Sequence, residues 1–585
     1  MSENQGLKNK HPTVEQIKKE YSAALDYNRA IALDDNVRIN ENYFVGKQWE
    51  HIKANGLPTP VFNFIKRAVL FAVASITTDN IKMQATPMGN AAEIKDADRA
   101  CQVVNKDFDE LFEMNKISAV IREFMRNAAV DGDGCTHTYW DSELETGLKH
   151  GSAKIKGGIV TEVLPNTKVF FGDPAERRVQ KQPFILIESR EETKRLKDRA
   201  KALGCSHWEE IQMDTNTHDV DSYKHHGDNK TTVILRYWRN TETKTIWACE
   251  TTADVMIRKP YDTKLKLYPI TWINWDYVQD SYHGMAMLTG LIPNQDFVNK
   301  AYAMSMVSMM TTAFPKIIYD RTRIPKWSNG VGQAIGVNGG DVSNVAKIMD
   351  PAQISPQISQ FIQQATDQTQ TFLGATPAAM GDTRPDNTSA IIALQRAAAI
   401  PSDITKQNMF QCIEDLGRIY VDFIATNYGK RTVMLPLPDT NQEMLMFAGF
   451  RLNEPMAVEF DYKTLADMPM TIKLDVGASS YWSEIAATQT LDNLLMNGHI
   501  TVEEYLERIP SGTIPKLQEL IEAHRQPPMM GGVMPGMDMG GGEAAAQPMP
   551  GSPQAQTLPG SIEVRGGGGY GALQRAINNT GEIPR

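Results

Sequence analysis

The feature that most constrains the fold is the order in which helical and extended patterns follow one another along the chain. Helical spacing dominates as far as Val130, and short β-rich segments separated by turn residues then run from Thr136 to Tyr277. Helical spacing returns from Pro293, and a second β-rich segment covers Thr432–Val476. Helices and strands that are grouped rather than alternating predict an α+β fold.

The helices before the first β-rich region have clear boundary signals. Thr13 and Gln16 have the spacing of a capping box, which predicts a helix that begins near Thr13, and Gly46 predicts a turn at its end. Further helices are expected over Asn63–Ile76, Glu93–Phe112 and Lys116–Val130, and a charged helical insert over Arg190–Met213.

After the first β-rich region, Pro293 is well placed as the first residue of a helix over Asn294–Thr312. A compact glycine-rich piece, Lys316–Asp350, follows it, and then a helix from about Ser355 to Phe372. Two short helices should close the folded part, over Trp482–Asn497 and from Thr501 toward Arg525. The composition beyond residue 526 is too poor in large apolar residues to offset the entropy of ordering.

The longest helical pattern covers Ala390–Asn427 and contains Pro401. Proline removes a backbone donor and clashes with the preceding turn, so Pro401 predicts either a kink in one helix or a turn between Ala390–Ile400 and Ser402–Asn427. One apolar stripe is expected after the proline, formed by Met409, Ile413, Leu416, Tyr420 and Phe423.

Charge and cysteine content exclude several classes of protein. The 70 acidic and 60 basic residues give a formal net charge of −10, which argues against a protein that grips DNA, because affinity for phosphate comes mostly from Lys and Arg. The five cysteines are odd in number and lack a CxxC pair, as in a reduced protein with buried thiols. The polar N-terminus and the short apolar runs predict neither a signal peptide nor a membrane span.

Four strings, in this order, resemble the portal proteins of tailed bacteriophages. They are NENYFVGKQW followed by PVFNFIKRAV, the segment from YPITWINW to the run NQDFVN and the closing FPK, the string FLGATPAAMGDTRPDNTSAIIALQRAA, and the segment from DVGASSYW to YLERIP. Together with the order of elements they span roughly residues 20–525. In the third string Ala390 follows Ser389, where the family usually has glycine.

The resemblance implies a domain order. It divides the chain into an N-terminal wing part (1–284), stem helix 1 (285–314), a clip (315–352) and stem helix 2 (353–373). A tunnel loop (374–389), a long kinked helix (390–429), a C-terminal wing part (430–480) and a helical crown (481–526) follow, before a low-complexity tail (527–585).

The resemblance also implies a function. The chain would form a dodecameric ring at one capsid vertex, assembled in the host cytoplasm, through which double-stranded DNA is packaged and ejected without specific binding. The expected partners are the large terminase at the clip, a head–tail adaptor, and the major capsid or scaffolding protein at the wing. The acidic excess predicts a mostly negative channel.

The candidate DNA-facing element is the tunnel loop, which would lie at the narrowest point of the channel; a plain surface turn between helices is the alternative. Its glycines and prolines predict an irregular, adaptable conformation. The candidate residues are Gly374, Gly381, Asp382, Thr383, Arg384, Asp386 and Asn387, with Pro401 as the kink that turns the loop toward the axis.

Other motifs favour no cofactor or enzyme. No Walker, GxSxG or HExxH motif is present, so packaging would need a partner motor. Two sets contain metal-ligating residue types without a metal spacing, and are interpreted as a turn entering a strand and as a solvated insert: Asp131, Asp133, Cys135 and His137, and Cys205, His207, His218, His225 and His226. A methionine-rich helix face is expected to pack between subunits, rather than against a soft metal or a membrane: Met304, Met306, Met309 and Met310.

Two rival functions remain open from the sequence. One is a soluble nucleic-acid-processing enzyme with a mixed fold, and the other is a different structural virion protein, such as a tail adaptor.

Overall fold

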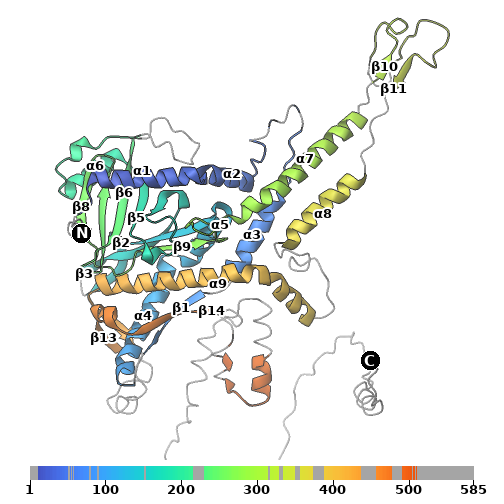
Figure 1. Cartoon of the computed structure of the whole chain (residues 1–585). Helices are drawn as coiled ribbons and strands as arrows, with labels where there is room; N and C mark the ends of the chain where they lie inside the picture. The colour runs from blue at the N-terminus through green and yellow to red at the C-terminus, as the bar shows by residue number, and fades with distance from the viewer. Residues whose placement is uncertain are drawn as a thin grey trace, which may run out of the picture. The chain divides into compact units, whose positions relative to one another are not determined.

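The computed structural model describes residues 11–50, 53, 56, 58–77, 81–88, 91–150, 153–214, 229–313, 317–328, 334–348, 356–372, 388–435, 456–476, 490–502, 505–506 and 509. All of them belong to one of two compact units, Met1–Thr513. Helices and antiparallel sheets are both extensive, which confirms the mixed α+β composition (Figure 1).

The N-terminal helices follow their sequence signals closely. Helix α1 (Val14–Ala30) begins after Thr13, whose side chain accepts a hydrogen bond from the Gln16 backbone N–H at 3.3 Å. The sequence predicted one continuous helix up to Gly46, whereas the structure has a break before α2 (Leu33–Val45), where Ala32 adopts a left-handed φ of 52°. Helices α3 (Phe64–Thr77), α4 (Ala91–Met114) and α5 (Ile117–Asp131) lie within two residues of their predicted bounds.

Two antiparallel sheets form the first β-rich region. The five-stranded sheet has the order β4 (Val169–Phe171), β5 (Phe184–Glu192), β6 (Lys230–Arg239), β7 (Ile246–Thr251) and β8 (Met256–Asp262). The three-stranded sheet has the order β3 (Ala153–Leu164), β2 (Asp133–His150) and β9 (Ile270–Asn274). The predicted charged helix is present as α6 (Thr193–Ala202) and is shorter than expected at both ends: residues 190–192 continue β5, and the helix ends at Ala202 instead of Met213.

A long-range strand pair joins the two ends of this unit. Strand β1 (Ile81–Pro87) pairs with β14 (Met470–Val476) in antiparallel register, with Met83 opposite Leu474. The second β-rich segment also contains β12 (Lys430–Leu435) and β13 (Met456–Asp461), which pair with each other. The sequence predicted this segment but not β1, whose only partner strand is almost 400 residues away within the described chain.

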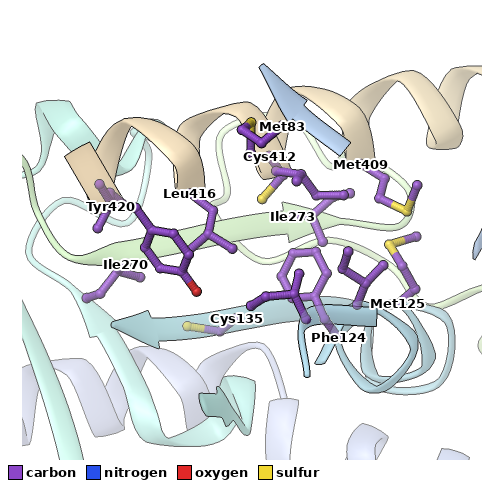
Figure 2. Close-up of a cluster of buried hydrophobic side chains, with 14 of the residues drawn as sticks. Met83, Phe124, Met125, Cys135, Ile270, Ile273, Met409, Cys412, Leu416 and Tyr420 are labelled. Atoms are coloured by element: carbon purple, nitrogen blue, oxygen red, sulfur yellow. The ribbon is translucent and has the colours of Figure 1, made fainter. Parts of the chain in front are cut away.

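The main hydrophobic core forms between the long helix α9 (Thr388–Asn427), the strands β2 and β9, and helix α5 (Figure 2). Each residue of the predicted apolar stripe is at most 4 % exposed, which confirms it: Met409, Ile413, Leu416, Tyr420 and Phe423. Burial of side chains of this size contributes about 1.5–3 kcal/mol each. The core therefore fixes the C-terminal half of α9 on the sheet.

Four cysteines lie in the interior, as the sequence predicted, and Cys205 is partly exposed. Cys135 and Cys412 belong to the core that Figure 2 shows. Burial raises the pKa of the Cys412 thiol to about 12 and that of Cys135 well above its usual value. Both therefore behave as packed apolar groups and not as nucleophiles.

The elements between β9 and α9 are a helix, a small hairpin and a second helix. Helix α7 (Met287–Ala313) is followed by β10 (Ile317–Tyr319), which pairs with β11 (Ala346–Ile348), and by α8 (Pro356–Phe372). The prediction that Pro293 begins the helix is wrong, because α7 starts six residues earlier and contains it. Pro293 has no N–H to donate to the carbonyl four residues earlier, so α7 lacks one backbone hydrogen bond at this point.

Candidate functional site

The predicted DNA-facing loop falls almost entirely outside the described residues. The residues concerned are Gly374, Gly381, Asp382, Thr383, Arg384, Asp386 and Asn387. The last two residues of the predicted loop, Thr388 and Ser389, begin α9. Pro401 lies within α9, which is one continuous element, and Figure 1 shows this helix changing direction toward its N-terminal end.

Two of the motifs that the sequence singled out contact each other. The run NQDFVN lies in α7, and NYFVGKQW covers the end of α2 and the residues after it. Tyr43 donates its hydroxyl proton to Asp296 at 2.5 Å, and the Asn299 amide donates to Gln48 at 2.7 Å. Burial, and after it the bond to Asp296, raises the pKa of Tyr43, which keeps this phenol protonated as a donor. The two motifs therefore form one polar joint in the N-terminal half of α7.

Buried amides complete this joint. Gln295 is fully buried, donates to the Asn299 side chain at 2.9 Å and to the Phe62 carbonyl at 2.8 Å, and accepts from the backbone N–H of Ile65. Asn63 caps α3 and donates to the last carbonyls of α2. Each of these groups would cost about 1–3 kcal/mol if it lost its partner, so the joint fixes α7 against α2 and α3.

A second anchor lies at the segment just before α7. Asp133, at the start of β2, is fully buried and accepts four hydrogen bonds. Asn274 and the Gly284 N–H donate to one oxygen at 2.7 Å each, and His283 at 2.7 Å and Asn166 at 3.2 Å contact the other. Four donors compensate the carboxylate for its removal from water. This cage holds residues 283–284 against the edge of the three-stranded sheet.

Two glycines permit the close approach in this cage. Gly132 has a φ of +102°, which favours glycine, and a Cβ there would lie 2.9 Å from the Gly284 carbonyl oxygen. A Cβ on Gly284 would lie 2.7 Å from both the Cβ of Asn274 and the carbonyl oxygen of Asp276. The string DGDG, which joins the end of α5 to the start of β2, is thus a docking turn for the segment that leads into α7.

The residues of the first metal hypothesis make other contacts in the structure. Asp133 is engaged by hydrogen-bond donors, and Cys135 and His137 lie along β2, with His137 in contact with the hydroxyl of Tyr237 at 3.1 Å. No group of three or more potential metal ligands occurs among the residues that the structure describes. Of the second set, Cys205 and His207 are described, and His218, His225 and His226 lie outside the described residues.

Helices α7 and α8 pack on each other through a small apolar interface. Val298, Ala301 and Ile362 are its buried residues. A hydrogen bond of 3.1 Å from the Asn294 amide to the hydroxyl of Thr369 crosses the same interface. The pair is therefore held by short, specific contacts on one side of each helix.

The outer surfaces of the two helices carry almost no charge. Only Asp296, Lys300 and Asp367 are charged among the 27 residues of α7 and the 17 of α8, although 22 % of the whole chain is charged. Lys300 lies 3.5 Å from Asp296, which balances it. Helices α7 and α8 therefore present no cation without a neighbouring anion that could bind a DNA phosphate.

The exposed part of α7 is apolar instead. Its large side chains are 39–65 % exposed: Phe297, Met304, Met306, Met309 and Met310. At about 100° per residue, Met304 and Met306 lie roughly 160° apart around the helix. Two opposite sides of α7 thus present apolar surface that a single neighbouring element cannot cover.

Comparison with known families decides the identity of the fold. The family model of Phage P22-like portal proteins matches residues 177–558, about two thirds of the chain. The chain belongs to the P22-like portal protein family. It is therefore a phage structural protein of the head–tail connector, and the resemblance of the four strings is confirmed.

The other comparisons add less. A chain of the structure titled "Neck of native GTA particle computed with C12 symmetry" is 10 % identical, with a TM-score of 0.34; the match covers 76 % of this portal protein and 91 % of that chain. No curated protein matches. The family is structural and not enzymatic, which weighs against the enzyme alternative. None of the described helices of this portal protein is long and apolar enough to cross a membrane.

Sequence reasoning missed Asp133, His283 and Gln295 as anchors of α7 in this portal protein. The sequence pattern placed Asp133 in a turn that enters a strand, with a metal site as the disfavoured alternative, and it placed His283 and Gln295 in a family string. The signal available was the clustering of Asn, Gln, Asp and His in strings otherwise rich in apolar residues, since buried polar groups require partners.

Proposed function

We propose that the protein forms a closed ring at the capsid vertex and conducts double-stranded DNA during packaging and ejection. A cyclic ring uses head-to-tail interfaces, in which each subunit presents two different surfaces to its two neighbours. The two opposite apolar sides of α7 meet this requirement. Twelve subunits are proposed from the resemblance to tailed-phage portals.

The observation that carries the proposal is the lack of charge on α7 and α8. DNA must slide in both directions, and each Lys or Arg on the path would hold a phosphate. A protein with six to ten such contacts binds DNA largely through charge, since its affinity falls about 10³–10⁵-fold between 50 and 200 mM salt. A stem with only three charged side chains on α7 and α8 avoids such strong binding of DNA. A neutral to negative channel fits the net charge of −10 as well.

The domain assignment is part of the proposal. The strand pair β1–β14 and the packing of α9 on β9 support a wing made from both ends of the chain, 1–284 and 430–480. The pair α7–α8 would be the stem (285–314 and 353–373), and β10–β11 the clip (315–352) at which the terminase and then a head–tail adaptor dock. The wing would contact the capsid or scaffolding protein. The loop 374–389 would face the DNA, and 481–526 would form the crown.

Electron microscopy of the purified full chain tests the ring. We expect rings with a central hole of duplex width, and a monomer at all salt concentrations would refute the proposal. A metal-dependent nuclease assay should show no cleavage.

A matched pair of variants tests the proposed interface. Met306→Glu with Met310→Glu should give monomers, because burial of an unpaired carboxylate costs several kcal/mol. Met213→Glu replaces a methionine that is 66 % exposed outside the stem, and its rings should persist. Rings that form equally well in both proteins would exclude this side of α7 from the interface.

A further inference from the structure

Helix α8 exposes a different kind of surface from α7. Five of its exposed residues are glutamines: Gln357, Gln360, Gln363, Gln364 and Gln368. Gln360 and Gln364 each lie about 160° around the helix from the buried Ile362, directly opposite the contact with α7. The outward face of α8 is therefore polar and almost uncharged at its centre, and Phe361, which is 57 % exposed, lies at its border about 100° from Ile362.

The composition of this face is unusual for an ordinary outer surface. Typical soluble domains contain about 25 % charged residues, and these lie mostly on the surface. Within α8, Asp367 is the single charged residue, and neither Lys nor Arg occurs in the 17 positions. A surface that stays in water and yet excludes cations fits a position beside phosphate.

We propose that α8 turns its glutamine face toward the bore and lines the stem segment of the DNA path, while the apolar sides of α7 pack between subunits. This inference rests on the ring proposed above. The two helices then have separate tasks, because the apolar surface of α7 needs protein cover and the face of α8 needs water.

Glutamine suits a sliding contact for a chemical reason. Its amide has two donors and an acceptor, so it can exchange bonds between water and phosphate oxygens. Neutral hydrogen bonds are about half as strong as those made by a charged donor, and they release no counterions. The DNA would meet many weak contacts, each replaceable by water.

Conversion of the lining into a cationic one tests the inference. Gln364→Lys, and independently Gln360→Lys, adds one cation per subunit to the proposed bore. The matched control is Gln102→Lys, which changes an exposed glutamine on α4. Thr312→Lys places the cation on an exposed position of α7 instead.

The probe is a short linear duplex, compared with a covalently closed circle of equal length that cannot thread through a ring. Both α8 variants should bind the linear duplex, with an affinity that falls about 10³-fold between 50 and 200 mM salt, and should bind the circle much less. Wild type and Gln102→Lys should show neither effect.

The outcomes separate the two proposals. Equal binding of the circular and the linear duplex by the α8 variants would overturn the proposal that α8 lines the bore. Preferential binding of the linear duplex by Thr312→Lys alone would overturn it as well. Both results leave the proposed ring intact. The absence of rings in the wild type would overturn the ring and the lining together.

Discussion

Removal of the Asp133 carboxylate should release the segment that leads into α7. In Asp133→Ala the four donors lose their acceptor, but two of them keep another partner. Asn274 also donates to the Tyr282 carbonyl at 2.7 Å, and Asn166 donates to the Asp131 carbonyl at 3.0 Å. The cost therefore comes mainly from the other two donors.

These two donors are the Gly284 N–H and the His283 ring, and within the described chain Asp133 is the acceptor recorded for each. A buried donor without a partner costs about 1–3 kcal/mol, so the local loss should be about 4 kcal/mol. In Asp133→Asn the side-chain oxygen can still accept from Gly284, and we expect less than half of this loss.

Hydrogen exchange of the purified protein measures this effect where it occurs. A loss of about 4 kcal/mol corresponds to roughly 10³-fold faster exchange of the Gly284 amide. The control is Asp254→Ala, because Asp254 is 80 % exposed and pairs with Lys18 on the surface; its effect should stay within about 0.5 kcal/mol. Equal exchange in the two variants would refute the reasoning that the cage anchors α7.

Three further sets of variants test other features. Burial raises the pKa of Asp107 to about 7, so the folded state holds a proton that the unfolded state releases near pH 4, and stability falls as the pH rises between these values. Asp107→Asn should remove this dependence and raise the free energy of unfolding by roughly 4 kcal/mol at pH 8 but little at pH 4, measured by urea unfolding; equal gains at both values would contradict it. Asn299→Leu should cost about 1–3 kcal/mol because the buried Gln48 loses its donor, and Gln48→Leu added to it should recover part of the loss in a thermal double-mutant cycle. Gly284→Ala should lower the midpoint of thermal unfolding because its Cβ would meet backbone, whereas Gly290→Ala, with no atom within 4 Å of its Cβ, should not lower it.

Local signals predicted most of the helices and the mixed class of the fold. The capping box at Thr13, the left-handed glycine at Gly46 and the apolar stripe from Met409 to Phe423 all act over a few residues. These signals depend only on residues that are close to one another in the sequence, so the sequence determines them directly. The family, too, followed from strings and element order, and the family model confirmed it.

Short-range patterns predicted the wrong helix boundaries where two backbone conformations fit the local sequence equally well. No local signal predicts the break at Ala32, and Pro293 fits the rule for a first helical residue although it lies inside α7. In both cases packing against other elements selects the outcome.

Only the tertiary structure decided which distant groups meet. Strand β1 pairs with residues almost 400 positions later, Tyr43 meets Asp296, and Asp133 meets the segment before α7. The sequence does not show which distant residue a polar side chain will contact, although a buried polar side chain requires a hydrogen-bond partner. The sequence alone therefore determined that helices of this kind form and that this is a portal-type chain. The folded chain determined that buried polar contacts, and not the motifs by themselves, hold α7 in place.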